Sequence, residues 1–452
     1  MEQQAVSVSD EVLIIGLGAT GLSVAKHLAR QGLAFAVADT RYQPPGLDAF
    51  KQLFPQASIW LGPLDANLLC QAARLVVSPG VSLAEPAIQE ALAAGVEVTG
   101  DIDLFCQATR TPILAITGSN AKSTVTCLTG ELASSLGLEV GVGGNLGLPV
   151  LDLLDEGTKD LYVLELSSFQ LETTHKLAAQ GAVILNISED HLDRYPSYED
   201  YVFAKQRIFH HAKQVIYNRQ DELTQPIHGL LAQASSFGLD APPGSSDLGL
   251  ADVEGELWLM RGEQQLMPAR QVPLAGEQGL QNVLAAFALL AAADLPVTGL
   301  AEVIGRFQGL PHRCQRVASK QGVDFFNDSK ATNLGATLAA IKGLSANYQH
   351  LWLILGGESK GQDFAKLTEA LRPAVSGVAL LGRDASLLAA SLPPGISHWF
   401  CDDMQEAVQC LAEQAQPGDA LVLTPACASF DQFQSYAHRG EVFTQCVQQL
   451  PG

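Results

Sequence analysis

A glycine-marked turn is the segment of the sequence best suited to hold a chain of phosphates. Thr117–Thr124 reads TGSNAKST, follows the apolar run PILAI and precedes a helical stretch. Backbone N–H groups and a lysine at a helix N-terminus bind phosphate oxygens, and the hydroxyl after the lysine can bind Mg²⁺. The strict G-x-x-x-x-G-K-[ST] pattern fails at Ile116 and at Ala121. Alanine at position 121 costs on the order of 1 kcal/mol if φ is positive there, and is tolerated if the backbone is helical or extended.

Acidic and histidine residues follow two later strands and could supply metal ligands. Glu165 ends the apolar run LYVLE, and an acid in that position beside a phosphate loop can bind Mg²⁺. The segment 188–194 (SEDHLDR) is rich in ionisable side chains, among them His191 and Asp193. A neutral imidazole with carboxylates can hold a divalent ion, although a polar loop with a hydrogen-bonded histidine has the same composition. Ser197 then predicts a helix N-cap, and Lys205 on that helix is of a kind that usually reaches the surface.

A second glycine pattern lies near the N-terminus. Gly16–Gly21 (GLGATG) follows an apolar run and opens a helical stretch, as in the fingerprint of dinucleotide-binding domains. Asp39 ends the next apolar run about 20 residues later, where an acid can bind a ribose hydroxyl. Taken alone, the pattern favours an NAD-dependent oxidoreductase. A turn of the same kind that binds another nucleotide, or none, stays open.

The elements that must position these residues alternate along the chain. Short β-branched runs are followed by Ala- and Leu-rich amphipathic stretches, which is typical of parallel α/β domains. The segment 236–273 breaks the alternation with Pro, Gly and Ser clusters and short alternating runs, and predicts a small antiparallel sheet. The expected strands are 12–15, 34–38, 75–77, 113–117, 161–164, 182–186, 323–327, 351–355, 378–381 and 420–423, and the expected helices include 21–31, 123–136 and 404–414.

Length and composition limit the possible classes of protein. At roughly 150 residues per domain, 452 residues predict three domains, which we place at 1–100, 101–309 and 310–452. The net charge of −21 argues against a nucleic-acid-binding protein, which needs a broad basic surface. The polar, acidic first residues predict no secretory signal, and the longest apolar stretch, 282–293, is shorter than the roughly 20 residues of a membrane span. The eight cysteines include no C-x-x-C pair, so we expect reduced, mostly core cysteines in a cytoplasmic protein with no membrane partner.

Eleven segments, taken in order, resemble the Mur ligases of bacterial cell-wall synthesis. The likeness runs from about Val12 to the C-terminus. It implies a Rossmann-like UDP-binding domain, a central P-loop-type ATPase domain with a parallel and a small antiparallel sheet, and a Rossmann-like C-terminal domain that binds an amino acid. It implies no nicotinamide, because a fold alone does not fix a function. The segments are GLGATGLS, DTRYQPPGL, SPGVSLAEP, GDIDLFC, ITGSNAKSTV, VGGNLGLP, LELSSFQLETT, EDHLDRY, GLPHR, NDSKATN and TPACASFDQF.

The resemblance is strongest with the members that add D-glutamate, and it implies an ATP-dependent amide ligase. Its substrates would be ATP, D-glutamate and UDP-N-acetylmuramoyl-L-alanine, with Mg²⁺ as cofactor, an acyl phosphate as intermediate and a monomeric chain. The implied catalytic residues are Lys122, Glu165, His191 and Lys205. The implied metal ligands are Ser123, Glu165, His191 and Lys205, the lysine in carbamylated form.

The resemblance also implies three sets of binding residues. The ATP set is Gly118, Ser119, Asn120, Ala121, Lys122, Ser123, Thr124, Asn282, Arg313 and Asp328. The UDP-substrate set is Ala19, Thr20, Thr40, Arg41, Ser78, Pro79, Gly80, Asn145 and His191. The amino-acid set is Thr332, Lys360, Ser429, Phe430 and Tyr436.

One departure from the family pattern bears on the adenine side of the ATP site. Gln278 and Gly279 stand where the family often has His-Asn. Two alternatives to a D-glutamate ligase stay open beside the oxidoreductase, the second of them because of this departure and of Ala121. One is a sibling Mur or folylpolyglutamate-type ligase for another amino acid. The other is a catalytically silent nucleotide-binding regulator.

Overall fold

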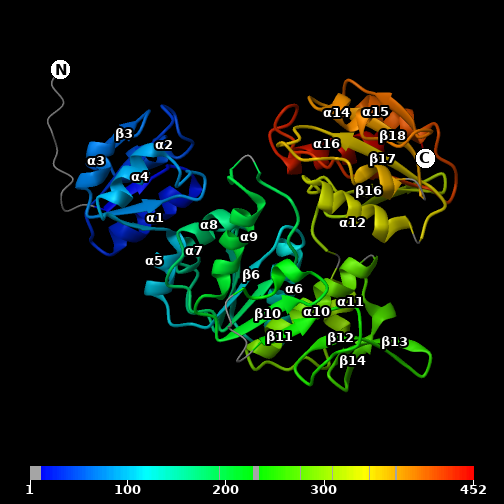
Figure 1. The fold of residues 1–452 in the computed structure, drawn as a ribbon, viewed down its shortest axis with the longest axis horizontal. Coiled ribbons are helices and arrows are strands. Elements are labelled where there is room, and N and C mark those ends of the chain that lie inside the picture. The colour runs from blue at the N-terminus through cyan, green and yellow to red at the C-terminus, as the bar shows by residue number, and fades with distance from the viewer. Residues whose placement is uncertain are drawn as a thin grey trace.

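The computed structural model describes residues 12–192, 194–227, 234–274, 276–307, 309–345, 347–371 and 374–451. Three separate sheets divide the chain, and each falls within one of the three predicted domain ranges. In Figure 1 the N-terminal domain (blue) is at the left, the central domain (cyan to green) is below, and the C-terminal domain (yellow to red) is at the right. The boundaries at residues 100 and 309 stay predictions.

The N-terminal domain is a parallel sheet of five strands in the order β3-β2-β1-β4-β5. Gly16 ends β1 with φ +94°, and a Cβ on Gly21 would lie 1.9 Å from the Gly16 carbonyl oxygen. The glycine pattern therefore lets helix α1 pack closely against the strand that precedes it. The strands are β1 (Val12–Ile15), β2 (Phe35–Asp39), β3 (Ile59–Leu61), β4 (Arg74–Val77) and β5 (Glu97–Thr99), and the helices are α1 (Ala19–Arg30), α2 (Leu47–Leu53), α3 (Ala66–Gln71) and α4 (Pro86–Ala93).

The central domain holds a sheet of nine strands in the order β14-β13-β12-β11-β10-β9-β6-β8-β7. Its strands are β6 (Ile113–Thr117), β7 (Val140–Gly144), β8 (Leu161–Glu165), β9 (Gly181–Ile184), β10 (Gln214–Asn218), β11 (Ala234–Phe237), β12 (Leu248–Val253), β13 (Glu256–Arg261) and β14 (Gln264–Pro268). Its helices are α5 (Asp101–Ala108), α6 (Lys122–Ser135), α7 (Val150–Leu153), α8 (Ser168–Glu172), α9 (Tyr198–Gln206), η1 (Arg207–Phe209), η2 (Glu222–Thr224), η4 (Ala269–Gln271), α10 (Gly276–Ala292) and α11 (Ala301–Arg306).

The expected antiparallel segment is present, but it is an extension of the large sheet. Strands β12, β13 and β14 pair antiparallel with one another. A single residue pair, Phe237 with Leu248, joins them to the parallel part. In the parallel part of the sheet β6 lies between β8 and β9, so the loops at the carboxyl ends of these strands meet at one edge, where ligands bind in open α/β sheets.

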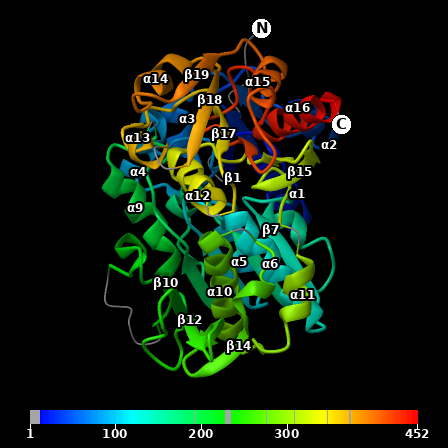
Figure 2. The same cartoon turned by 90° about the vertical axis from the view of Figure 1, so that its right-hand side faces the viewer.

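The C-terminal domain has six strands in the order β15-β16-β20-β17-β18-β19, all parallel except the β15–β16 pair. Figure 2 shows α12 of this domain above α10 of the central domain, and the two helices are in contact. The strands are β15 (Gln315–Lys320), β16 (Val323–Asn327), β17 (Leu351–Gly356), β18 (Val375–Leu381), β19 (Ser397–Phe400) and β20 (Ala420–Leu423). The helices are α12 (Leu334–Ser345), α13 (Leu367–Leu371), α14 (Ala385–Ala390), α15 (Met404–Ala412) and α16 (Tyr436–Gln449).

The longest apolar stretch of the sequence is a core helix. It forms most of α10, whose residues from Asn282 to Leu290 are all buried, and it packs against α6 and the central sheet. No helix within the described ranges is long and apolar enough to cross a membrane. All eight cysteines are free, with Cys401 and Cys427 buried and the others partly buried.

Candidate active site

The phosphate-type loop lies between β6 and α6 and is held by the segment that follows β9. The backbone N–H of Ser119 donates to the carbonyl of Asn186 (2.9 Å), and that of Asn120 donates to Asn186 Oδ1 (2.8 Å). The Ser119 hydroxyl lies 2.9 Å from the Tyr201 hydroxyl and donates to the Ser188 carbonyl. These hydrogen bonds fix the loop's shape from two neighbouring strand ends.

Ala121 is the N-cap of α6 and lies in the left-handed region, with φ +65° and ψ −4°. Of the two cases considered for this position, the structure has the one with positive φ, in which alanine is strained. A Cβ in this region costs on the order of 1 kcal/mol. The surrounding loop and the buried position of Ala121, which is 3% exposed, hold the backbone in this shape.

Two lysine amines share one carbonyl oxygen beneath this loop. Lys122 Nζ and Lys205 Nζ each donate to the Gly118 carbonyl over 2.8 Å. Lys205 is 2% exposed and lies over the Tyr201 ring, so the expectation of a surface lysine is wrong. Burial lowers the pKa of Lys205 well below its usual range, and the neighbouring charge of Lys122 lowers it further. Burial lowers the pKa of Lys122 as well.

A carboxylate and a hydroxyl lie beside these lysines. Glu165 is 2% exposed; its Oε1 accepts from Asn145 Nδ2 (2.9 Å), and its Oε2 is buried with no hydrogen-bond partner. Burial would raise the pKa of Glu165, but the charges around it, Lys122 foremost, hold the pKa below its ordinary value. Ser123 Oγ accepts a hydrogen bond from Lys330 Nζ of the C-terminal domain (2.8 Å).

The acidic segment after β9 also faces the C-terminal domain. Asp190 accepts from Asn333 Nδ2 (3.1 Å) and lies 3.8 Å from Lys360 Nζ. His191 is half-buried, with its ring 4.8 Å from that of Phe169, and burial lowers its pKa to about 4, so the imidazole is neutral. Asp193 lies outside the described residues. In the described part of the chain, no group of three or more His, Cys, Asp or Glu side chains could hold a metal ion.

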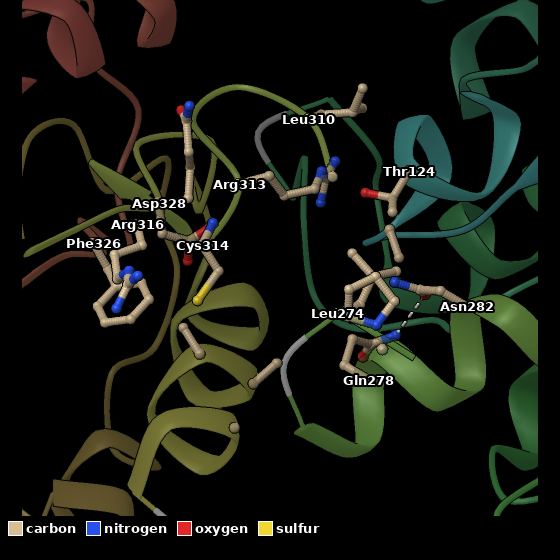
Figure 3. Close-up of a pocket in the computed structure, with 18 of the residues that line it drawn as sticks. Thr124, Leu274, Gln278, Asn282, Leu310, Arg313, Cys314, Arg316, Phe326 and Asp328 are labelled. Carbon is tan, nitrogen blue, oxygen red and sulfur yellow. Dashed lines mark hydrogen bonds between the residues drawn. The ribbon is translucent and has the colours of Figure 1, made fainter. Parts of the chain in front are cut away.

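A cavity of about 1090 Å³ opens between the central and C-terminal domains (Figure 3). It is lined by Asn120, Ala121 and Thr124 of the loop, and by Asn282, Arg313 and Asp328 of the predicted ATP set. Thr124 Oγ1 and Arg313 Nε are buried there without partners. Burial raises the pKa of Asp328 to about 7, against the lowering effect of Arg313. Unpartnered polar atoms around a cavity of this size fit a nucleotide that supplies the missing hydrogen bonds.

The predicted amino-acid residues are grouped around one buried arginine. Arg439, 1% exposed, donates six hydrogen bonds to Ser329, Gly356, Cys427 and Ala428. These partners lie within a few residues of Thr332, Lys360 and Ser429, and Tyr436 begins the helix that carries Arg439. Phe430 differs from the others, because its side chain is 71% exposed.

Seven of the nine predicted UDP residues lie at the carboxyl ends of β1, β2 and β4, whereas Asn145 and His191 follow β7 and β9 of the central domain. Ala19 and Thr20 begin α1, Thr40 and Arg41 follow β2, and 78–80 follow β4. The Asp39 carboxylate accepts from the Leu17 N–H (2.6 Å) and from the backbone N–H, Nε and Nη2 of Arg41 (2.8, 2.9 and 2.8 Å). These bonds fill its acceptor sites, so it has no free lone pair for the ribose hydroxyl expected of an NAD site.

The sequence interpretation missed Lys330, Asp190 and Asn333. Lys330 stands between Asp328 and Thr332 in the NDSKATN segment, and Asp190 precedes His191, so proximity within the motifs was the available signal. Their contacts with the loop and with Lys360 join parts of the chain more than 140 residues apart, such as Asn333 with Asp190.

Three α/β domains around a phosphate-type loop define a multidomain nucleotide-dependent enzyme. Family models match residues 10–100 (Mur ligase MurD-like, N-terminal domain), 116–290 (Mur ligase middle domain) and 312–427 (Mur ligase, glutamate ligase domain). The chain belongs to the Mur ligase family, whose members depend on ATP.

Relatives of known name match nearly the whole chain. UDP-N-acetylmuramoylalanine–D-glutamate ligase of Pseudomonas putida is 50% identical over 96% of each chain. The enzyme of the same name from Pseudomonas aeruginosa is 47% identical over 97% of this chain and 98% of its own.

Solved structures share the fold at low identity. A pseudomurein peptide ligase type C from Methanothermus fervidus matches with a TM-score of 0.63 and 17% identity, over 98% of this chain and 100% of its own. UDP-N-acetylmuramate-alanine ligase from Thermotoga maritima matches with a TM-score of 0.59 and 18% identity, over 97% and 99%. These likenesses confirm the three-domain α/β architecture.

Proposed function

We propose that this chain is an ATP-dependent ligase that joins D-glutamate to UDP-N-acetylmuramoyl-L-alanine in the synthesis of peptidoglycan precursors. The observation that carries the proposal is the identity of about half of all residues, over nearly the full length, with relatives named for that reaction. The match of residues 312–427 to a glutamate ligase domain supports the choice of amino acid.

The reaction has two steps. The L-alanine carboxylate attacks the γ-phosphorus of ATP and breaks the bond from that phosphorus to the oxygen that bridges it to the β-phosphate. ADP leaves, and the L-alanine carboxyl group becomes an acyl phosphate. The D-glutamate amine then attacks the acyl carbon, loses a proton and displaces inorganic phosphate through a tetrahedral intermediate. A carboxylate must approach a triphosphate in the first step, so the site has to neutralise negative charge.

The chain's own cations supply that neutralisation. In our proposal the loop 118–124 binds the β- and γ-phosphates through its backbone N–H groups and Lys122. Arg313 Nε and Thr124 Oγ1, both buried without partners, provide further donors on the walls of the cavity. Lys330 contributes a positive charge beside Ser123, and burial lowers its pKa to about 8. Asp328 and Asn282 complete the proposed nucleotide site.

The residues present fit Mg²⁺. The buried, unpartnered Oε2 of Glu165 and the hydroxyl of Ser123 are hard oxygen ligands, and Mg²⁺ commonly combines one or two protein oxygens with phosphates. His191 has a neutral imidazole that could add a nitrogen ligand. When bound, the metal would offset the charge of the phosphates.

The buried amine of Lys205 supports its proposed carbamylation. A lowered pKa makes the neutral, nucleophilic amine available, and the amine can attack carbon dioxide to give a carbamate and release a proton. The carbamate would replace a cation with an acid beside Lys122 and Glu165, and would so add an oxygen ligand to those of Glu165 and Ser123.

The remaining predicted residues complete the proposal. The UDP part would bind at Ala19, Thr20, Thr40, Arg41 and 78–80, with Asn145 and His191 reaching the sugar-peptide. D-Glutamate would bind at Thr332, Lys360, Ser429, Phe430 and Tyr436, where Lys360 can pair with a carboxylate. We propose a monomer that acts in the cytoplasm, where ATP is available.

The test is phosphate release with ATP, Mg²⁺ and UDP-N-acetylmuramoyl-L-alanine, with D-glutamate present or omitted. Release that requires D-glutamate is expected. A panel of other amino acids serves as control, and release with one of them in place of D-glutamate would indicate a sibling ligase. No release under any condition would favour a silent nucleotide-binding protein.

A further inference from the structure

An arginine of the central domain is bonded to a loop of the N-terminal domain. Arg194 Nη2 donates a hydrogen bond to the backbone carbonyl of Val81 over 2.9 Å. Val81 directly follows residues 78–80, which the proposed function assigns to the UDP part of the substrate. The contact therefore joins the proposed UDP site of one domain to the domain that carries the phosphate-type loop.

The central domain holds the Arg194 guanidinium in one orientation. Its Cζ lies 4.4 Å from the centroid of the Phe169 ring, and its Nη2 lies 3.6 Å from Glu172 Oε2; both partners belong to α8. The side chains of Arg194 and Glu172 are 16% and 17% exposed, so solvent screens their attraction only weakly. A planar guanidinium can stack on a ring and pair with a carboxylate at the same time, which an ammonium group cannot do. Arg194 therefore presents its donor to Val81 from a fixed position.

The same arginine is tied to His191, which the proposed function places at the sugar-peptide part of the substrate. The Arg194 backbone N–H donates to the His191 carbonyl (2.9 Å). The Phe169 ring, on which the guanidinium lies, has its centroid 4.8 Å from that of the His191 ring. Through these contacts Arg194 relates the position of Val81 in one domain to that of His191 in the other.

The loop around Val81 keeps its shape through bonds within its own domain. The Ser78 N–H donates to the Ile15 carbonyl (2.8 Å), and the Ser78 hydroxyl donates to the Gly16 carbonyl (3.1 Å). The Val81 N–H donates to the Ser78 carbonyl (2.9 Å). The bond from Arg194 is therefore not needed to form the UDP site, and it acts on where that site lies.

Other contacts keep the two domains together when Arg194 is changed. Helix α1 of the N-terminal domain lies beside α7 of the central domain (Figure 1), and Ser23 Oγ donates there to Asp152 Oδ1 (2.7 Å). One continuous hydrophobic cluster includes buried residues of both helices, among them Val24 and Leu151. Loss of the Arg194 bond should therefore shift the UDP site slightly without detaching the domain.

We propose that Arg194 is a positioning residue that holds the UDP site at the correct distance from the phosphate-type loop. A substrate anchored by its UDP end must bring its carboxylate to the γ-phosphate of ATP in the other domain. A displacement of about 1 Å can reduce the rate on the order of 100-fold. Arg194 acts on the distance between the two sites and on neither site alone. The inference rests on the proposed function and adds a residue that lies outside the predicted site sets.

Calorimetry with three ligands, in the presence of Mg²⁺, tests the inference. UDP occupies only the N-terminal site, ATP only the central site, and UDP-N-acetylmuramoyl-L-alanine spans both domains. In Arg194→Met the dissociation constants of UDP and ATP should stay within about two-fold of the wild type, because each site keeps its own contacts. The spanning substrate should bind at least about ten-fold more weakly, and its KM should rise by a similar factor while the KM for ATP stays unchanged.

Two further variants separate position from charge. Arg194→Lys keeps the positive charge but not the stacked, forked donor, so it should lose affinity for the spanning substrate nearly as much as Arg194→Met. Full recovery in Arg194→Lys would show that charge alone matters and would overturn the inference. Arg30→Met is the matched control, since Arg30 pairs with Asp155 between the same two domains but both side chains are largely exposed, at 41% and 50%. It should leave all three dissociation constants unchanged.

The remaining outcomes also decide the question. Equal weakening of UDP and of the spanning substrate in Arg194→Met would assign Arg194 to the UDP site itself and overturn the inference, as would wild-type binding of the spanning substrate. An equal loss for all three ligands, with a lower free energy of unfolding in urea, would show a merely structural role and count against it. If wild-type protein neither bound UDP-N-acetylmuramoyl-L-alanine nor released phosphate, the proposed function would fall, and the inference with it.

Discussion

The central and C-terminal domains each bury a cationic side chain, and they hold it in opposite ways. Arg439 of the C-terminal domain donates six hydrogen bonds to carbonyl and hydroxyl oxygens of four residues. Lys205 of the central domain donates one, to a carbonyl that also accepts from Lys122. The two side chains are equally inaccessible, with 1% and 2% exposed.

The difference fits a structural role for Arg439 and the functional role that we propose for Lys205. A guanidinium whose N–H groups all donate hydrogen bonds to protein oxygens holds the loops that carry those oxygens together and stabilises them. An amine that shares its acceptor with a second amine is poorly solvated, and such a group marks a place where an anion or a chemical modification belongs. The contacts of Arg439 therefore support a role in stability, and those of Lys205 support the role in binding or catalysis that we propose for it.

The largest effect should follow removal of the functional cation. Lys205→Met is expected to reduce phosphate release by at least about 100-fold, because the proposed metal ligand and charge are lost. Stability should stay within about 1 kcal/mol, because an apolar residue replaces a buried, poorly satisfied amine. Lys213→Met is the control, since Lys213 is exposed and its amine donates to Gln180 Oε1. Turnover at the wild-type rate by Lys205→Met would show that the carbamate has no role.

Removal of the structural cation should act chiefly on stability. Arg439→Met leaves several buried carbonyls without donors and should lower the free energy of unfolding of the C-terminal domain by about 3–5 kcal/mol. Because its partners adjoin Thr332, Lys360 and Ser429, KM for D-glutamate should rise more than KM for ATP. Denaturant unfolding followed by tryptophan fluorescence and steady-state kinetics measure the two effects.

Arg383 offers a matched control for Arg439. Its side chain is 58% exposed and pairs with Glu358 on the surface of the same domain. Arg383→Met should leave both the unfolding curve and the KM for D-glutamate unchanged. If Arg439→Met were as stable as the wild type, the distinction between the two buried cations would fail.

Local patterns predicted the framework well, because strand formation depends on runs of a few residues. The strands at 12–15, 113–117, 323–327 and 420–423 have the predicted bounds, and Ser197 caps α9 by accepting from Asp200 N–H (3.1 Å). The helix predicted at 21–31 begins two residues earlier, at Ala19.

The contents of the site were harder to predict, because they depend on contacts between distant parts of the chain. Lys205 Nζ donates to the carbonyl of Gly118, which lies 87 residues earlier in the sequence. Lys330 Nζ donates to the hydroxyl of Ser123, which lies 207 residues earlier. Asp39 has the position of a ribose-binding acid, yet its hydrogen bonds to Leu17 and Arg41 use its oxygens. Resemblance named the site residues, and their roles remain proposals.

The smallest effect is expected for two alanines with positive φ, one in the central domain and one in the C-terminal domain. Ala121 beside the lysines has φ +65°, and Ala426 beside the carbonyls held by Arg439 has φ +59°; both are almost fully buried. Glycine at either position should relieve about 1–2 kcal/mol of strain and lose about 0.5–1 kcal/mol through its greater freedom when unfolded. Each substitution should therefore raise the free energy of unfolding by at most about 1.5 kcal/mol, as measured in urea.

Valine at each position should have the opposite effect. A β-branched residue is rarely found in the left-handed region, so Ala121→Val and Ala426→Val should each lower the free energy of unfolding. The two glycine substitutions should have similar effects on stability but different effects on ATP binding. Ala121→Gly alters a phosphate-type loop and should change the dissociation constant for ATP by a few-fold at most, whereas Ala426→Gly should leave it unchanged. If Ala121→Gly instead raised turnover many-fold, the backbone strain at Ala121 would limit catalysis in the natural protein, and its effect would not be confined to stability.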